Sequence, residues 1–453
     1  MTSISISQAA GYQAALDDIY RTFMAVKHLN KGRFDRDARQ PQRLLAIARA
    51  RGIMPPSACT LKVSGSKGKG TTARIAARML QQQWPDAKIG LFVSPEEDEH
   101  YDRARINGVA MTSDQFIRHY TALKPQLRIA EATLTEPDYL SPLGIFLLLA
   151  LDWFRTEGAD YVVLETGRGV AHDEVGQIPS KVGILTSIML EHADKLGPTL
   201  SDIARDKLSL CQTSTIVIAS PQVAIVAPPI NNLTLINSHS AGYTQQPKWL
   251  SLNYDLARVG VEQLLGQALP PDQLTDLCDF SASFGQRLIG AHTYVFEGLI
   301  HTDSLDADLL DSWQREHLPT QVIASFPDDK DREQLLATFK SRGWPVTECV
   351  LTGTRGYLDY TRTTADDAAA RCTFAFDDVA GFAVWLAARP AATRPGRTYL
   401  AGTQTYIRLV RKALALMATT GGNDASTGRP TAPSQCRQHC AAGPPEAALP
   451  RHH

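Results

Sequence analysis

The chain has 453 residues, 43% of them hydrophobic and 21% charged, which is ordinary for a soluble protein of two or three domains. Lys and Arg (46) nearly balance Asp and Glu (47), so the net charge of −1 excludes the basic footprint of a general nucleic-acid binder. The longest apolar run, 145–151, falls far short of the roughly 20 residues that span a bilayer. The N-terminus lacks the features of a signal peptide, and the seven cysteines are scattered, as in a reduced compartment. We expect a cytoplasmic protein without nucleic-acid or membrane partners, as a monomer or small homo-oligomer.

The first sixty residues predict helices, joined by a charged connector at 33–39 whose alternating signs are typical of a solvated surface. From residue 61 onward, short β-rich runs alternate with helical stretches such as 73–83 and 143–154. The β-rich runs are 61–64, 89–93, 161–164, 182–186 and 216–219. Buried strands that alternate with helices indicate an α/β fold whose parallel sheet is covered on both faces.

A second, smaller α/β series follows an irregular stretch at 222–250 and a helix expected at 254–265. Its elements are β-rich runs at 293–296, 321–325, 350–352 and 397–401 and helices near 331–342 and 379–388. Past residue 418 the chain is rich in Gly, Pro and Ser and cannot bury enough apolar surface to order. We therefore expect a nucleotide-binding domain at 1–288, a second domain at 293–417 and a disordered tail at 418–453.

A glycine-rich segment stands directly after the first predicted strand and before a helix, the context of a phosphate-binding loop. Its glycines bring backbone N–H groups close to phosphate oxygens, Lys69 neutralises phosphate charge, and the Thr71 hydroxyl is suited to Mg²⁺. A glycine-rich turn without a ligand is the alternative. The candidate nucleotide ligands are Gly65, Ser66, Lys67, Gly68, Lys69, Gly70, Thr71 and Thr72.

Polar side chains follow three other predicted strands: Ser94, Glu165, and the pair Glu191 and His192. The carboxyl ends of parallel strands form the ligand crevice of an open α/β sheet. Each residue alone fits a turn or a helix cap. Together with the phosphate loop, the oxygens of Thr71, Ser94 and Glu165 and one imidazole favour Mg²⁺ bound to nucleotide phosphates.

The sequence resembles the folylpolyglutamate synthase and Mur ligase superfamily over roughly residues 15–417. The resemblance rests on a series of motifs in family order: LKVSGSKGKGTT (61–72), LFVSP (91–95), RING (105–108), VLETG (163–167), TSI through EH (186–192), IARDK (203–207), HTDSL (301–305) and AGT through Tyr406 (401–406). It implies a P-loop-type ATPase domain with a parallel sheet, followed by a smaller α/β domain like the C-terminal domain of Mur ligases.

The resemblance also implies a reaction and roles for individual residues. Family members use ATP to phosphorylate a substrate carboxylate, and an amine then attacks the acyl phosphate to give an amide. It implies two Mg²⁺ ions held by Thr71, Ser94, Glu165 and His192, and a CO₂-derived carbamate on Lys207. The implied catalytic residues are Lys69, Lys207, His192 and His301, and those implied to contact the nucleotide outside the loop are Asn253, which is expected to open a helix, and a hinge arginine, Arg287.

Departures from the family pattern gather on the substrate side. The pair Ser66-Lys67 is unusual in the loop, and the acid expected three residues before His301 is absent, with Glu297 one position away. After Ser94-Pro95 stand four acids, 96–99, which would repel an anionic folate. We therefore expect a ligase that joins an amino acid or other amine to a non-folate carboxylate. The alternatives are a genuine dihydrofolate or folylpolyglutamate synthase, and a nucleotide-binding but inactive regulatory subunit.

Overall fold

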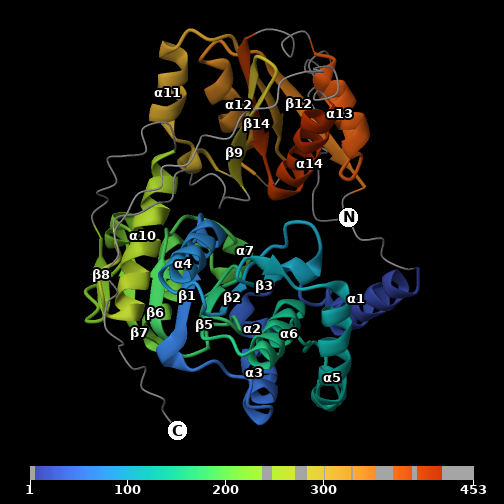
Figure 1. Ribbon diagram of the computed structural model, residues 1–453, viewed down its shortest axis with the longest axis vertical. Helices are drawn as coiled ribbons and strands as arrows, with labels where there is room; N and C mark the ends of the chain where they lie inside the picture. The colour runs from blue at the N-terminus through green and yellow to red at the C-terminus, as the bar shows by residue number, and fades with distance from the viewer. Residues whose placement is uncertain are drawn as a thin grey trace, which may run out of the picture.

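A computed structural model describes residues 6–236, 247–270, 283–299, 301–327, 330–353, 371–389 and 395–420. The chain forms two α/β lobes, blue to green and yellow to red in Figure 1, each built on its own sheet. This arrangement confirms the α/β fold class expected from the sequence. The expected disordered tail lies outside the described residues from 421 onward, whereas 418–420 belong to the last helix.

Within the described residues, the sheet of the first lobe has eight strands in the order β4-β3-β2-β5-β1-β6-β7-β8. Strands β2 and β5 to β8 run parallel with β1, and β3 and β4 continue the edge as an antiparallel hairpin. The central strand β1 is buried at every position because neighbours and helices cover it on all sides. The bounds are β1 Thr60–Ser64, β2 Ile89–Phe92, β3 Ala104–Ile106, β4 Val109–Ala110, β5 Tyr161–Glu165, β6 Ser180–Leu185, β7 Ser214–Ala219 and β8 Leu233–Leu235.

Helices cover both faces of this sheet. On one face, α1 Ile6–Val26, α3 Pro41–Ala50, α5 Ser113–Glu131 and α6 Pro142–Glu157 share a core with Phe92 and Leu164. On the other face, α4 Lys69–Gln83 packs against α10 Lys248–Leu265. The shorter helices are α2 Asp35–Ala38, η1 Ser57–Cys59, η2 His100–Arg103, α7 Ala193–Leu196, α8 Leu200–Leu208, α9 Leu210–Thr213 and η3 Pro221–Ile225.

Helix α10 begins at Lys248, six residues before the expected start. Trp249 and Leu250 join its apolar face, which the surrounding Pro, Asn and Ser residues obscure in the sequence. The stretch expected to be irregular also holds η3 and the edge strand β8. No helix in the described part of the chain is long and apolar enough to cross a membrane.

The second lobe, as far as it is described, has a six-stranded sheet in the order β13-β12-β11-β14-β10-β9. The bounds are β9 Phe284–Ile289, β10 His292–Gly298, β11 Thr320–Ser325, β12 Val346–Thr352, β13 Arg371–Ala375, β14 Gly396–Gly402, η5 Thr302–Ser304, α11 Ala307–Arg315, α12 Arg332–Lys340, α13 Val379–Ala387 and α14 Gln404–Thr420. Strand β9 pairs antiparallel with β10 around Gly290, whose φ of 62° suits a tight turn. The second sheet therefore begins at Phe284, inside the range 1–288 expected for the first domain.

Candidate active site

The phosphate loop connects the end of β1 to the first residue of α4, Lys69. Gly65 and Gly68 have φ values of 137° and 86°, which favour glycine. A Cβ atom on Gly65 would lie 2.0 Å from Thr186 Oγ1, and one on Gly68 would lie 2.5 Å from Asn253 Nδ2. The backbone therefore packs tightly on its surroundings and ends at a helix N-terminus, where free N–H groups bind phosphate.

Two lysines of the loop point in different directions. Lys69 lies over the loop, where its Nζ donates to the carbonyls of Gly65 (2.9 Å) and Ser66 (3.3 Å). Lys67 Nζ instead lies against the second lobe, 3.4 Å from Glu297 Oε1 and 3.0 Å from Ser304 O. Lys69 is thus placed to neutralise phosphate charge. Lys67 was expected among the phosphate ligands, but its ammonium lies against the second lobe instead.

Glu165, at the end of β5, is a buried carboxylate that forms no ion pair within the described part of the chain. Its Oε2 accepts a hydrogen bond from the Ser94 backbone N–H (2.8 Å), which joins two of the expected metal ligands. Burial raises the pKa of Glu165, and the nearby charge of Lys69 opposes the rise. A buried carboxylate without a counter-ion is a fitting place for a divalent cation.

The other expected oxygen ligands lie at the same edge of the sheet. Thr71 is buried in the first turn of α4, and Ser94 Oγ accepts from Arg103 Nη1 (3.1 Å). Among the residues that the structure describes, no three His, Cys, Asp or Glu side chains gather as a metal site of their own. This donor set suits Mg²⁺, which is commonly held by one or two carboxylates together with substrate phosphates.

Lys207 lies next to the phosphate loop, as the resemblance implies. Its fully buried Nζ donates to Gly65 O (3.0 Å) and Arg168 O (2.9 Å) and lies 3.2 Å from Glu191 Oε1. Burial lowers the pKa of Lys207 to about 8 even though Glu191 opposes this shift.

His192 is half-exposed and lies 3.9 Å from the Glu191 carboxylate. Desolvation and the neighbouring lysines lower its pKa to about 4. Its ring is therefore neutral at pH 7, as a metal ligand must be.

The three remaining residues of the expected site occupy different surroundings. Asn253 lies in the second turn of α10 rather than at its start, and its buried amide nitrogen, beside Gly68, has no hydrogen-bond partner among the described residues. Arg287 is exposed on the edge strand β9, where it donates to Gln286 O (3.3 Å), so it is not at a hinge. His301 precedes η5 in the second lobe, with Nε2 3.9 Å from Asp331 Oδ2.

A cavity of about 420 Å³ opens beside Lys69, Ser94 and His192 and extends between α1 and α6. Its cationic lining residues are Lys69, Arg39, Arg103 and Arg168, and its aromatic ones are Tyr20, Phe23, Tyr139 and Phe146. The rings of Phe23 and Tyr139 are 5.3 Å apart, and the Arg103 guanidinium lies 5.3 Å from the Phe146 ring. The cavity therefore combines flat apolar walls with positive charge at the end nearest the phosphate loop.

The arginines of this cavity are residues that the sequence analysis missed. Buried Arg39 binds Asp173 Oδ2 (3.3 Å) and Glu174 Oε2 (2.5 Å), and Arg168 makes a bidentate contact with buried Asp35 (2.5 and 2.7 Å). The connector at 33–39 was expected to be solvated, but these partners, more than 130 residues away, bury one of its two Asp residues, Asp35, and one of its Arg residues, Arg39. Only the tertiary structure brings them together.

The acidic segment, residues 96–99, is held by cations of the protein itself. Glu96 contacts Arg103 and Arg408, Glu97 contacts Arg74, Arg105 and Arg411, and Asp98 contacts Lys412. Burial would raise the pKa of Glu96, but the contact with His100 Nδ1 (3.4 Å) and the charge of Arg103 outweigh it and hold this pKa well below its usual range. The expectation that this segment repels an anionic substrate is therefore wrong, because most of its charge is neutralised in place.

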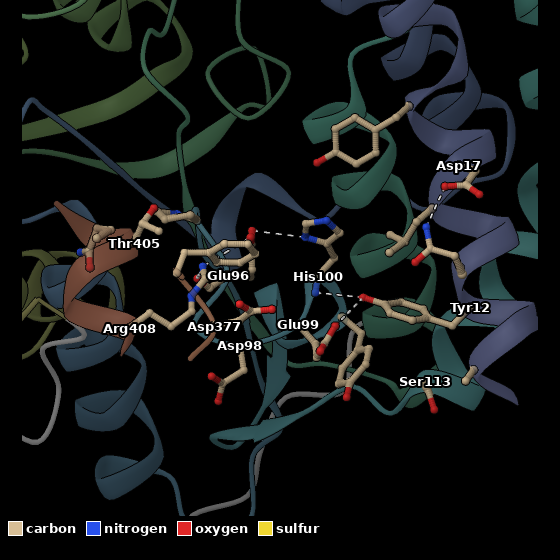
Figure 2. Close-up of a pocket in the computed structure, with 18 of the residues that line it drawn as sticks. Tyr12, Asp17, Glu96, Asp98, Glu99, His100, Ser113, Asp377, Thr405 and Arg408 are labelled. Atoms are coloured by element: carbon tan, nitrogen blue, oxygen red, sulfur yellow. Dashed lines mark hydrogen bonds and ion pairs between the residues drawn. The ribbon is translucent and has the colours of Figure 1, made fainter. Parts of the chain in front are cut away.

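A second cavity, of about 980 Å³, lies between α1, the acidic segment and α14 (Figure 2). Tyr12 from α1 donates to Glu99 Oε2 (3.4 Å), and Arg408 and Thr405 approach from the second lobe. Pro95 lines both cavities. Tyr20 of α1 also lines both, so the two cavities are neighbours.

The fold and the site together define a nucleotide-binding protein of the phosphate-loop class with a second α/β domain packed beside the loop. Residues 63–227 match the Mur ligase middle domain family. This segment, about a third of the chain, is therefore similar to the middle domain of Mur ligases.

Curated relatives match parts of the chain. A probable bifunctional folylpolyglutamate synthase/dihydropteroate synthase of Halobacterium salinarum is 32% identical over 147 residues, which are 32% of this chain and 17% of that protein. The dihydrofolate synthase/folylpolyglutamate synthase of Escherichia coli is 26% identical over 216 residues, 48% of this chain and 47% of that protein. The chain thus spans less than half the length of these relatives.

Solved structures share the whole fold. A folylpolyglutamate synthase of Mycobacterium tuberculosis complexed with ADP has a TM-score of 0.65 at 17% identity, covering 90% of this chain and 100% of that chain. A bifunctional folylpolyglutamate synthase/dihydrofolate synthase of Yersinia pestis complexed with AMPPNP and a Mn ion has a TM-score of 0.61 at 17% identity, covering 88% of this chain and 98% of that chain. At this identity the likeness shows the two-lobed fold alone.

Proposed function

We propose that the protein is an ATP-dependent carboxylate–amine ligase of the folylpolyglutamate synthase type, which adds an amino acid to the carboxylate of a substrate that carries an aromatic ring system. The observation that carries this proposal is the 420 Å³ cavity, whose aromatic lining lies beside Lys69 and Ser94. A substrate with a flat ring system and an anionic end fits this lining better than a small aliphatic acid does. The names of the relatives point to the same substrate class.

The chemistry follows from the placement of the loop and the cavity. A substrate carboxylate at the Lys69 end of the cavity attacks the γ-phosphorus of ATP, and the bond to ADP breaks as the acyl phosphate forms. The amine nitrogen then attacks the acyl carbon, loses a proton, and releases phosphate. The chain contributes mainly positioning and charge neutralisation, through the loop N–H groups and Lys69. Mg²⁺, held by Glu165, Ser94, Thr71 and His192, would neutralise the phosphate charge.

Neutralisation of the acidic segment removes the argument for a non-folate substrate. Five arginines and a histidine of the protein contact Glu96 and Glu97. The two carboxylates therefore exert little electrostatic repulsion on an anion in the smaller cavity. Three cations of the smaller cavity, Arg39, Arg103 and Arg168, are likewise paired with carboxylates of the protein. Lys69 forms no ion pair among the described residues, so its charge supports an anionic group at that end of the cavity. The genuine folylpolyglutamate or dihydrofolate synthase is therefore the better-supported form of the proposal.

The larger cavity is our candidate for the incoming amino acid. It carries carboxylates from Asp17, Asp98 and Asp377 as well as cations from Lys27 and Arg408, which together suit a zwitterion. It also lies against the second lobe, through Thr405 and Arg408 of α14. An amine bound near Pro95 would be next to the smaller cavity, because Pro95 lines both.

We further propose a carbamate on Lys207. The buried amine beside Glu191 carries its positive charge at a cost, and a carbamate would supply an anionic group next to the phosphate loop. In ¹³C-bicarbonate, wild-type protein with Mg²⁺ and ADP is expected to give a carbamate ¹³C NMR signal that Lys207→Ala lacks. An identical spectrum for both proteins would refute the assignment.

The experiment that tests the function measures ADP release with ATP, Mg²⁺, L-glutamate and each of several carboxylates. We expect turnover with tetrahydrofolate or dihydropteroate and none with small aliphatic acids. Turnover only with a non-folate carboxylate would restore the other ligase alternative. ATP binding without turnover on any carboxylate would instead indicate the inactive regulatory subunit.

A further inference from the structure

Glu297, on β10 of the second lobe, is a buried carboxylate with donors on both oxygens. Its Oε1 accepts from Trp249 Nε1 (3.1 Å) and faces Lys67 Nζ (3.4 Å), and its Oε2 accepts from the Tyr399 hydroxyl (2.6 Å). The side chain is only 2% exposed. The three partners come from α10, the phosphate loop and β14, so one carboxylate links both lobes.

Lys67, whose side chain is 15% exposed, also contacts groups outside its own loop. Besides Glu297, its Nζ donates to Ser304 O (3.0 Å) and lies 5.2 Å from the centre of the Trp249 ring. Ser304 belongs to η5, the turn that directly follows His301. The loop lysine therefore holds the segment that carries the candidate histidine of the second lobe.

The surroundings of the pair are apolar and continuous between the lobes. One core cluster includes Leu61 and Ile75 beside the phosphate loop and Val295, Leu309 and Tyr399 of the second lobe. A charge left unpaired in such surroundings costs several kcal/mol, on the order found when one member of a buried pair is removed. The ammonium and the carboxylate are therefore stable here only together, when the lobes are docked.

We propose that Lys67 and Glu297 form a buried joint that docks the second lobe on the phosphate loop and positions the His301 turn. Lys67 is then a positioning residue and not a phosphate ligand. The sequence departs from the family pattern at two places, a lysine in the loop and an acid four residues before His301. In the structure these two residues are partners in one ion pair. The kinetic part of this inference rests on the proposed function, whereas the docking part does not.

Hydrogen exchange tests the docking part without any turnover. We expect Lys67→Met and Glu297→Gln each to raise the exchange rates of the amides at 295–305 by about tenfold or more. Because the pair acts as a unit, the double variant should exchange no faster than the worse single variant. Lys67→Arg keeps the charge and should stay within about threefold of wild type. The proposal would be overturned if the increases in exchange rate were additive in the double variant, or if both single variants exchanged at the wild-type rate.

A matched control is the ion pair of Lys248 and Asp308, which also connects the lobes, from α10 to α11, but is exposed on both sides. Lys248→Met should change the same exchange rates less than about twofold, because exposed pairs contribute little. Circular dichroism and thermal melts of every variant separate local undocking from global unfolding. If Glu297→Gln fails to fold, Lys67→Met and Lys67→Arg still decide the outcome.

Nucleotide binding distinguishes the joint from a phosphate ligand. We expect Lys67→Met to keep the Kd for ATP within about threefold of wild type while kcat falls by about tenfold or more, since the His301 turn loses its support. An ATP affinity reduced about 100-fold, with unchanged exchange at 295–305, would show that Lys67 binds phosphate and would refute the proposal. If the wild type lacks ligase activity, the exchange and binding measurements still decide.

Discussion

Glu165 is the single residue on which the candidate metal site depends most. Its carboxylate is buried, accepts a hydrogen bond from the Ser94 N–H and lies near the charge of Lys69, and we propose that it binds Mg²⁺. Glu165→Gln keeps the shape and should reduce ADP release at least on the order of 100-fold, the effect of losing one charge stabiliser. The fold should remain, because a neutral amide suits this buried position.

The matched control is Glu333→Gln, an exposed glutamate on α12 that is expected to leave turnover unchanged. Steady-state ADP release and a thermal melt measure both variants. A Glu165→Gln protein that retains more than about a third of wild-type turnover would show that the carboxylate has no part in the reaction.

At the residue scale, the sequence predicted where a residue lies in the fold better than it predicted where its side chain points. The order of strands and loop was enough to place Lys69, Glu165 and Lys207 at one sheet edge, because parallel strands end together there. It could not show that the Lys67 side chain turns to the second lobe, or that Arg39 and Arg168 reach the cavity. Their partners lie 130 or more residues away along the chain, and local patterns carry no information about such pairs.

At the scale of elements, the central strand β1 carries an unusual buried charge. Lys62 is fully buried and donates to Gly176 O (2.9 Å) and Thr213 Oγ1 (2.6 Å), and burial lowers its pKa to about 7. Between pH 7 and its ordinary pKa of 10.5, the unfolded chain binds more protons at this site than the folded chain. The contribution of Lys62 to the unfolding free energy should therefore rise with pH in this window.

Denaturant unfolding of wild type and Lys62→Met measures this contribution. The wild type should gain roughly 2 kcal/mol relative to the variant between pH 7 and 9, from about 1.4 kcal/mol per unit of pH. Because the variant has no titrating group there, subtracting the two curves removes other pH effects. A difference that is flat in pH would mean that Lys62 is protonated in the folded protein at its ordinary pKa.

The acidic segment shows why an element cannot be assigned a function from its own residues. Four acids in succession predict a negative surface. In the structure, Arg408, Arg411 and Lys412 face the segment because spacings of three and four place them on one side of α14. The sequence contains both halves of this contact, but only the docking of the second lobe joins them.

At the scale of the whole molecule, the alternation of strands and helices was sufficient to predict two α/β units, because buried parallel strands have a distinctive apolar pattern. The start of the second sheet was placed too late in the sequence, because β9 (FGQRLI) has three polar or glycine residues in six and does not resemble a buried strand. The joint between the lobes and both cavities depend on how the units pack. The local patterns of the sequence carry no information about this packing, which is why the acids at 96–99 were read without their partners.

The central claim is that ATP activates a folate-type carboxylate as an acyl phosphate in the cavity beside Lys69. The most direct measurement uses tetrahydrofolate or dihydropteroate labelled with ¹⁸O in the reacting carboxylate, with ATP, Mg²⁺ and L-glutamate. Our account predicts one ¹⁸O atom in each phosphate released, in step with amide formation, and loss of this transfer in Glu165→Gln. Amide formation with unlabelled phosphate would contradict the acyl phosphate, and ATP hydrolysis without any amide would contradict the folate substrate.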